Sequence, residues 1–145
     1  MNIKQRTVFS RVLVAALILL SLILPEVFAA GKKEKQYINL TAEEFYQLIL
    51  DNKQNNDFII LDVRTPAEYN EGHIADSNMI DFYADDFAEL ISRLDKSKTY
   101  AVYCRSGNRS GRILKMMEGM GFDTVYNMLG GIKSWEALSL PVIKK

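Results

Sequence analysis

Short apolar segments alternate with amphipathic helical segments along this 145-residue chain, and that alternation constrains the fold more than any other feature. Residues 58–61 read Phe-Ile-Ile-Leu, the continuous apolar pattern of a strand that is covered on both faces. Residues 108–119 instead place Ile113, Met116 and Met117 at helical spacing. Strands and helices that alternate with short links favour a parallel sheet with helices on both faces. The sequence therefore predicts an α/β fold.

Two capping boxes mark the starts of two predicted helices. Thr41 is followed three residues later by Glu44, and Thr65 is followed in the same way by Glu68. Proline at position 66 suits the first turn of the second helix. The predicted strands are 37–40, 58–61, 78–80, 98–103 and 124–126. The predicted helices start after Thr41 and Thr65 and otherwise cover 85–94, 108–119 and 132–138, the fourth being closed by Gly119 or Gly121.

The only cysteine, Cys104, follows an apolar strand and opens the sequence Cys-Arg-Ser-Gly-Asn-Arg-Ser-Gly-Arg. Backbone N–H groups at a helix start, with arginines nearby, favour a thiolate over a thiol and would also hold an anionic substrate. The alternative is a cysteine that only packs in the core, but loop residues follow Cys104 directly. We therefore expect a reactive, partly exposed sulfur surrounded by inward-pointing main-chain N–H groups.

Asp62 and Cys104 both stand where a predicted strand ends. Ligand sites of parallel sheets lie at the carboxyl ends of the strands, so we expect the two loops to be neighbours. The Asp62 carboxylate is expected to brace these loops by accepting hydrogen bonds, with Arg64 as its ion partner. His73, the only histidine, is expected to be structural, because a thiol of lowered pKa needs no separate base.

The N-terminus has the order of a secretory signal. Basic residues precede the apolar run 12–24, and the small residues Val27 and Ala29 precede an expected cut before Ala30. A retained membrane anchor is the alternative, but the run is shorter than the roughly 20 residues that cross a bilayer. The sequence predicts a signal peptide over 1–29 and export, most simply to a periplasm, with no membrane attachment after cleavage.

Chain length, charge and cysteine count limit the number of domains and the kinds of partner that the chain can have. A polar, mobile leader is predicted for 30–36 and one domain for 37–145, since the chain is too short for two ordinary domains. The formal net charge is +0, so nothing favours nucleic acid as a partner. A single cysteine forms no internal disulfide, which favours a cysteine kept for its reactivity. The oligomeric state stays open.

Three segments resemble one family. Residues 104–110 resemble the active-site loop of rhodanese-type sulfurtransferases, and residues 62–74 (Asp-Val-Arg-Thr-Pro-Ala-Glu-Tyr-x-x-Gly-His-Ile) resemble its second signature. Residues 130–135 (Gly-Gly-Ile-x-x-Trp), with Pro-Val at 141–142, resemble its C-terminal end. The resemblance covers about residues 37–143. It implies a three-layer α/β/α rhodanese-like fold with a mostly parallel five-stranded sheet, as in single-domain exported thiosulfate sulfurtransferases.

The resemblance also implies a chemistry. The Cys104 thiolate would attack the outer sulfur of thiosulfate, release sulfite and hold the sulfur as a persulfide until cyanide or another thiol removes it. Loop N–H groups would cradle the persulfide charge, and Arg109, with Arg105, would hold the sulfonate of the donor. The implied partners are a small anionic sulfur donor and a thiol or cyanide acceptor, with no cofactor and no metal. The implied substrate-binding residues are Arg105, Ser106, Gly107, Asn108, Arg109 and Ser110.

Other functions compete with this hypothesis. Tyrosine and dual-specificity phosphatases separate their cysteine and arginine by five residues, whereas four residues separate Cys104 from Arg109 here. A non-catalytic persulfide carrier or anion-binding module, and a redox thiol that needs a partner thiol, remain alternatives. The chain also departs from the family at 75–77, where Ala-Asp-Ser replaces the usual Pro-Gly-Ala, so the turn there must be built differently.

Overall fold

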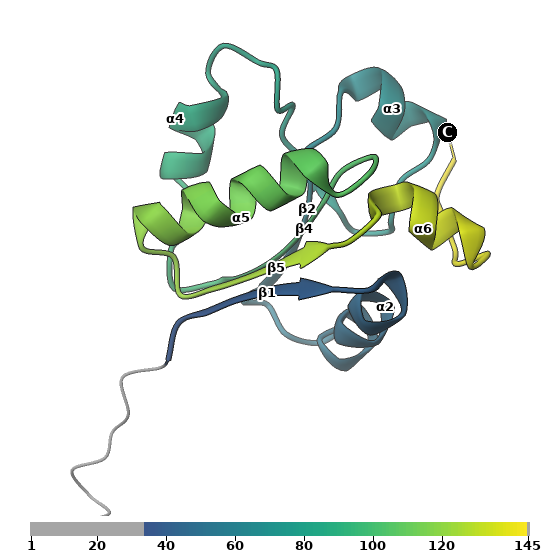
Figure 1. Ribbon diagram of the computed structural model, residues 1–145, viewed down its shortest axis with the longest axis horizontal. Coiled ribbons are helices and arrows are strands. Elements are labelled where there is room, and N and C mark those ends of the chain that lie inside the picture. Colours follow the sequence, from purple (N-terminus) through teal and green to yellow (C-terminus); the bar gives the residue numbers. More distant parts are fainter. Residues whose placement is uncertain (1–33, 145) are drawn as a thin grey trace, which may run out of the picture. The chain divides into compact units, whose positions relative to one another are not determined.

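A five-stranded parallel sheet forms the centre of the computed structural model, which describes residues 34–144 (Figure 1). The strand order is β1-β5-β4-β2-β3, so the α/β prediction is confirmed. The predicted signal peptide and most of the predicted leader lie outside the described residues, and Gln36 already belongs to β1. The strands are β1 (Gln36–Leu40), β2 (Phe58–Asp62), β3 (Asn78–Met79), β4 (Thr99–Tyr103) and β5 (Thr124–Met128).

Helices cover both faces of this sheet. On β4, Tyr100 and Val102 belong to one buried cluster, and Ala101 and Tyr103 belong to the other, as the alternation of a strand requires. Helices α4 and α5 pack on the first cluster, and α2 and α6 pack on the second. The three-layer prediction is therefore confirmed (Figure 1). The helices are α2 (Ala42–Asp51), α3 (Pro66–Glu71), α4 (Phe87–Ser92), α5 (Asn108–Met120) and α6 (Gly131–Ala137).

Both predicted capping boxes are present. At α2 the Glu44 N–H donates to Thr41 Oγ1 at 3.2 Å, and the Thr41 N–H donates to Glu44 Oε2 at 2.8 Å. At α3 Thr65 and Glu68 make the same pair of bonds at 3.3 and 3.0 Å. These bonds satisfy N–H groups that a helix start leaves without an intrahelical partner. Local sequence therefore fixes where these two helices begin.

Three local details refine the prediction. Helix α4 begins at Phe87 rather than at residue 85, because the preceding residues form turns in which the Phe87 N–H donates to the Ala84 carbonyl at 3.1 Å. Helix α5 ends at Met120 and is closed by Gly121, whose φ of 85° is the left-handed conformation that glycine favours. In the turn at 75–77, Asp76 takes a φ of 59°, a conformation that aspartate tolerates better than most residues.

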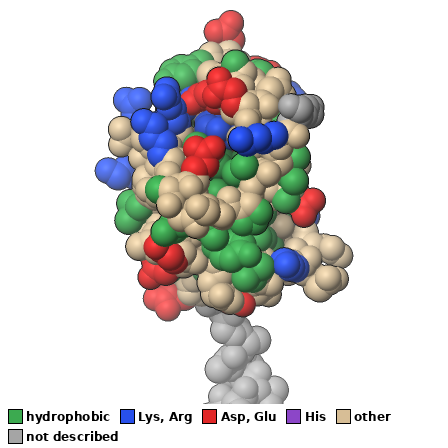
Figure 2. All heavy atoms as spheres, turned by 90° about the vertical axis from the view of Figure 1, so that its right-hand side faces the viewer, with side chains coloured by type: hydrophobic (Ala, Val, Ile, Leu, Met, Phe, Trp, Pro, Cys, Tyr) green, Lys and Arg blue, Asp and Glu red, His purple; other side chains and the backbone are tan. Residues whose placement is uncertain are grey.

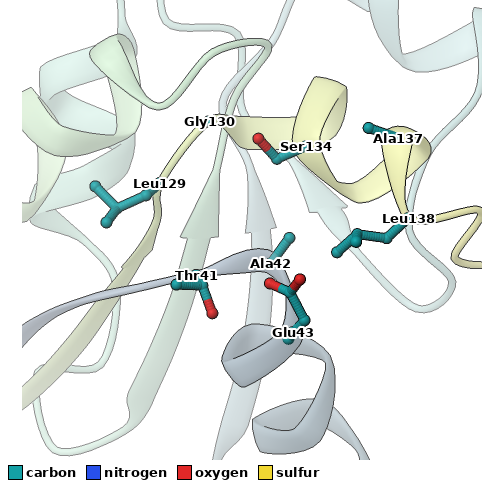
Figure 3. Close-up of a pocket in the computed structure, with 8 residues that line it drawn as sticks. All are labelled: Thr41, Ala42, Glu43, Leu129, Gly130, Ser134, Ala137 and Leu138. Atoms are coloured by element: carbon teal, nitrogen blue, oxygen red, sulfur yellow. The ribbon is translucent and has the colours of Figure 1, made fainter.

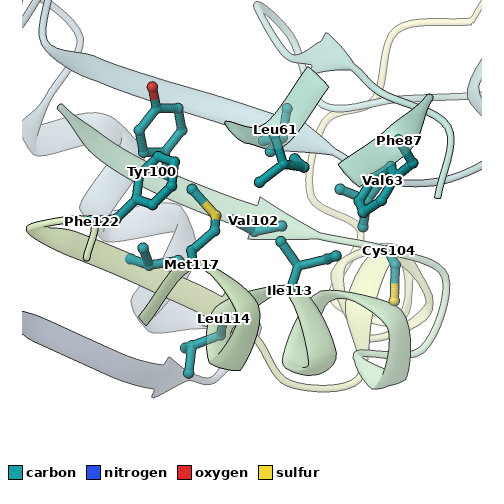
Figure 4. Packing of buried hydrophobic residues seen from close by; sticks show 12 residues of the cluster. Leu61, Val63, Phe87, Tyr100, Val102, Cys104, Ile113, Leu114, Met117 and Phe122 are labelled. Carbon is teal, nitrogen blue, oxygen red and sulfur yellow. The ribbon is translucent and has the colours of Figure 1, made fainter. Parts of the chain in front are cut away.

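The core reaches the carboxyl ends of the strands. Cys104 lies at that end of the α4–α5 cluster, with Val63, Phe87 and Ile113 (Figure 4). Asp62 of β2 stands opposite Tyr103 of β4, so the loops that follow these strands are neighbours, as predicted. The methionines of α5 pack in this cluster, and Met128 of β5 and Trp135 are buried on the other face of the sheet. Within residues 34–144, no helix has the length and apolarity to cross a bilayer.

Candidate active site

The loop after β4 folds around the sulfur of Cys104. The Gly107 N–H donates to Cys104 Sγ at 3.2 Å, and the Ser110 hydroxyl donates to it at 3.4 Å. Gly107 reaches this position with a φ of 86°, and Asn108 begins α5 directly after it. One main-chain donor of the loop, the Gly107 N–H, therefore points toward the sulfur, as the sequence predicts. The loop places hydrogen-bond donors, and no carboxylate, next to the sulfur atom.

These donors control the ionisation of the thiol. Burial raises the pKa of Cys104, but the Ser110 hydroxyl and the N–H groups of Ser110, Ser106 and Gly107 outweigh that effect. The pKa of Cys104 is consequently lower than the ordinary value of a cysteine. A cysteine that only packed against apolar neighbours would show the opposite shift. The electrostatics of the loop thus favour the nucleophilic thiolate.

The expected partial exposure of Cys104 is wrong. Its exposed fraction is 0%, because the loop closes around the sulfur on one side and the α4–α5 core packs against the side chain on the other. Inward-pointing donors require this closure, since N–H groups reach one atom only if the backbone wraps around it. Chemistry at Cys104 therefore requires a local opening of the loop or of its surroundings.

The two arginines of the loop stand in different environments. Arg109 donates from both Nη atoms to Glu68, at 2.8 and 2.7 Å, and its guanidinium lies 5.5 Å from the centre of the exposed Tyr83 ring. Arg105 is exposed and makes no ion pair among residues 34–144. Of the two cations predicted to hold a sulfonate, Arg109 is already neutralised and Arg105 is available.

Glu68 is a site residue that the sequence does not reveal. Its hydrogen bonds with Arg109, together with those from Thr65, outweigh the opposing effect of burial and lower the pKa of the Glu68 carboxyl to about 2. The same interaction raises the pKa of Arg109. In the sequence Glu68 is fully explained as the acid of a capping box, so no signal indicates that its carboxylate also faces the cysteine loop.

The carboxyl ends of the strands carry mixed charge. A pocket of about 290 Å³ lies beside the loop and is lined by Arg105, Lys133, Glu71 and Glu136, among others. Figure 2 faces this end of the domain and shows basic and acidic side chains together on its upper part, with hydrophobic side chains below. An anionic donor would approach through a surface that offers it some attraction and no strong net field.

Asp62 and Arg64 form a buried pair next to the loop. Both Asp62 carboxylate oxygens accept from the Arg64 side chain, at distances from 2.7 to 3.0 Å. Asp62 also accepts from the Arg64 N–H, and Arg64 Nη2 donates to the Gly72 carbonyl at 2.7 Å. The predicted ion pair is confirmed. It joins the end of β2 to the end of α3.

Tyr103 extends this buried network. Its hydroxyl accepts from the Ile74 N–H at 3.1 Å and lies 3.2 Å from the Ser77 hydroxyl. Burial, followed by the neighbouring Asp62 charge, raises the pKa of Tyr103, so this phenol stays protonated. Ser77 belongs to the segment that departs from the family pattern, and the network shows how that turn is held.

His73 makes contacts with α3 and with the C-terminal segment. Its ring stacks on Tyr69 with centroids 3.8 Å apart, and Nδ1 lies 3.1 Å from the Tyr69 carbonyl. Its backbone pairs with Ile143 in an antiparallel bridge. These contacts tie the end of α3 to the C-terminal segment, which agrees with the predicted structural role.

A second pocket, of about 400 Å³, opens between the start of α2 and α6 (Figure 3). Leu129 and Leu138 line it together with Gly130 and Ser134. Cys104 does not contribute to its lining, so its volume says nothing about access to the sulfur.

The chain is similar to known proteins in sequence and in structure. The family model of the Rhodanese-like domain matches residues 41–138. A sulfurtransferase of Allochromatium vinosum is 30% identical over 104 residues, which cover 72% of this chain and 92% of that protein. The thiosulfate sulfurtransferase GlpE of Coxiella burnetii is 31% identical over 101 residues, covering 70% of this chain and 89% of that one.

A solved structure gives the same result for the fold. The crystal structure of a rhodanese-related protein from Thermoplasma volcanium matches with a TM-score of 0.63 and 32% sequence identity. The match covers 75% of this chain and 100% of that chain. The sheet and the helices described above are therefore those of the matched family.

Proposed function

This chain belongs to the family of rhodanese-like domains, and from that membership we propose that it moves sulfane sulfur from thiosulfate, or a similar donor, to a thiophilic acceptor through a Cys104 persulfide. Relatives named as sulfurtransferases support the general activity, transfer of sulfur. The donor and the persulfide are the finer part of the proposal.

The reaction runs in two displacements. The Cys104 thiolate attacks the outer sulfur of thiosulfate, the S–S bond of thiosulfate breaks, and sulfite leaves with the bonding electron pair. The product on the protein is a persulfide anion. An acceptor such as cyanide then attacks the terminal sulfur, forms thiocyanate and returns the thiolate. No oxidant or reductant is consumed in either step.

One observation carries this proposal. The donors of Gly107 and Ser110 converge on a single sulfur atom, and the pKa of Cys104 is lowered although its burial opposes ionisation. A cradle of this kind stabilises both the attacking thiolate and the persulfide anion, because both place negative charge inside the loop.

An intact mass measurement tests the proposal. Protein incubated with excess thiosulfate and freed of small molecules is expected to gain the mass of one sulfur atom, and Cys104→Ser is expected to gain none. Sulfite released in the first step should equal the protein that carries the adduct. Absence of an adduct with thiosulfate and with other sulfane donors would refute the proposal.

A persulfide carrier is the second candidate, and the complete burial of Cys104 favours it. A carrier would shelter the sulfur from small acceptors and deliver it to a partner protein. It would form the same adduct but release almost no thiocyanate with cyanide. Steady-state thiocyanate formation therefore separates the enzyme from the carrier.

We also propose that the chain is exported and cleaved after Ala29. The basic, apolar and small-residue segments in their order along residues 1–29 support this. The test is the mass of the protein recovered from its native cell envelope, which should begin at Ala30. A full-length mass in a membrane fraction would indicate a retained anchor instead.

A further inference from the structure

The start of α6 is bonded to the backbone of the cysteine loop. The Ile132 N–H donates to the Cys104 carbonyl at 2.8 Å, and the Lys133 N–H donates to the Arg105 carbonyl at 3.3 Å. No side chain caps α6. The first turn of a helix leaves its N–H groups without intrahelical partners, so here the loop carbonyls satisfy them. The loop and the helix therefore fix each other.

This contact exists because residue 131 is glycine. A Cβ atom on Gly131 would lie 2.3 Å from the Cys104 carbonyl oxygen, 2.6 Å from the Arg105 carbonyl carbon and 2.7 Å from the Ser106 nitrogen. All three neighbours are backbone atoms, which no change of rotamer would move aside. The φ of Gly131 is also 60°, a conformation that other residues rarely adopt.

The contact also orients the peptide unit between Arg105 and Ser106. In a trans peptide the C=O and the N–H point in opposite directions, and the described chain holds no cis peptide bond. Because the Arg105 carbonyl faces α6, the Ser106 N–H faces away from α6. That N–H is one of the groups that lower the pKa of Cys104. A displaced α6 would let this peptide unit rotate.

We infer that Gly131 is a positioning residue for the sulfur chemistry: by admitting the first turn of α6 to the backbone of residues 104–106, it fixes the Arg105–Ser106 peptide with its carbonyl toward α6 and so holds the loop in the conformation from which the Gly107 N–H donates to Cys104 Sγ. This inference rests on the proposed function for its biological meaning. The structural claim itself concerns only the orientation of the Arg105–Ser106 peptide, which can be tested without sulfur transfer.

Gly131→Ala tests the inference, and Gly119→Ala is the matched control. Gly119 lies in α5 without a positive φ, and a Cβ atom there would meet nothing within 4 Å. The readout is the rate of alkylation of Cys104 by iodoacetamide between pH 5 and 10, measured on protein whose folding is verified by thermal unfolding. This readout reports the pKa of the thiol and requires no turnover.

Gly131→Ala is expected to raise the apparent pKa of Cys104 by about one unit, which means about tenfold less thiolate below that pKa. Gly119→Ala is expected to leave the pKa unchanged. A role in stability alone would lower the melting temperature of Gly131→Ala and leave its pKa equal to that of the wild type. That result would overturn the inference.

Lys133→Pro is the second test variant, to be used if Gly131→Ala does not fold. Proline removes the N–H that binds the Arg105 carbonyl, and it is tolerated in the first turn of a helix. Lys133→Ala is its control, because it removes the exposed side chain and keeps the N–H. A raised thiol pKa in Lys133→Pro alone supports the inference, and equal values in both variants contradict it.

The two proposals fail separately. If the wild type forms no persulfide while Gly131→Ala raises the pKa of the thiol, the proposed function is wrong and the positioning role stands. If the wild type transfers sulfur while Gly131→Ala folds and matches its thiol pKa and its kcat/KM, the positioning role is wrong and the function stands.

Discussion

Two arginine–carboxylate pairs flank the cysteine loop, and they differ in burial and in what else they hold. Asp62 and Arg64 have side chains that are 0% and 4% exposed, and Arg64 also bonds the Gly72 carbonyl. Glu68 and Arg109 are 21% and 13% exposed, and the exposed Tyr83 ring lies over the guanidinium. The Asp62–Arg64 pair is buried and is called the interior pair. The Glu68–Arg109 pair is partly exposed beside the cysteine loop and is called the rim pair.

This difference assigns different roles to two similar ion pairs. Breaking a pair that water does not reach leaves an uncompensated buried charge, so separating Asp62 from Arg64 would strongly destabilise the fold. Water reaches part of the Glu68–Arg109 pair, and an anion that approaches the loop competes with Glu68 for the same guanidinium. We therefore expect the first pair to support the fold and the second to respond to substrate.

The largest predicted effect comes from breaking the interior pair. Asp62→Asn keeps the shape of the side chain but leaves Arg64 without its counterion. We expect a loss of about 3–5 kcal/mol in the free energy of unfolding, measured by denaturant titration. The matched control is Asp57→Asn, since Asp57 pairs with Lys98 at 3.9 Å on the surface. The control should cost less than about 0.5 kcal/mol; equal losses in the two variants would remove the distinction between interior and surface pairs.

Breaking the rim pair is expected to cost less stability and to change substrate binding. Glu68→Gln keeps acceptor capacity for the cap of α3 but removes the charge, so we expect a loss of about 1–2 kcal/mol in the free energy of unfolding. Because Arg109 then lacks an internal anion, the KM for thiosulfate should fall about threefold, a change of roughly 0.6 kcal/mol. Steady-state sulfite release measures it.

The control for the rim pair is Glu89→Gln, which removes the carboxylate of an exposed pair with Arg93 on α4. It should change neither stability beyond about 0.5 kcal/mol nor the KM for thiosulfate. If Glu68→Gln raises the KM instead, Glu68 acts by orienting Arg109 for the donor, and the idea of competition fails.

The sequence predicts the fold well because burial is periodic along it. The apolar strand at 58–61 and the capping boxes at Thr41 and Thr65 each depend on residues a few positions apart, and all three are found in the structure. The start of α4 differs because residues 85 and 86 have no apolar or capping role that fixes a boundary. Loops of this kind are set by tertiary contacts.

The site is only partly predictable from the sequence. That the loops after Asp62 and Tyr103 are neighbours follows from strand direction, and the main-chain donor from Gly107 follows from the loop sequence. The contact between Glu68 and Arg109 spans 41 positions, and local spacing gives no hint of it. The burial of Cys104 likewise depends on how the whole loop closes, which composition does not encode.

Lowering the pH gives a further test of the Glu68–Arg109 pair. The pKa of the Glu68 carboxyl is about 2 in the folded chain, below its ordinary value of 4.5. A lowered folded pKa adds stability above the ordinary pKa, and this contribution is lost as the pH falls toward about 2. The difference in unfolding free energy between wild type and Glu68→Gln should therefore be full near pH 6 and shrink steadily below about pH 4.5. Denaturant titrations of both proteins at matched pH values measure it, and a constant difference down to pH 2 would contradict the assigned role of Glu68.

The smallest predicted effect concerns the cation that neither pair uses. Arg105 adjoins Cys104, is exposed and has no ion-pair partner among residues 34–144, so it is free to attract the donor while Arg109 is bound to Glu68. Arg105→Gln should raise the KM for thiosulfate about threefold with little change in kcat, as expected for one exposed, solvent-screened charge. Added salt should reduce the difference in KM between wild type and Arg105→Gln, because it screens exposed charges.

In the Glu68→Gln background, Arg105→Gln should change the KM for thiosulfate less, since Arg109 would then be free to bind the donor. If both backgrounds respond equally, the two arginines bind the donor independently, and the rim pair does not regulate access to Arg109.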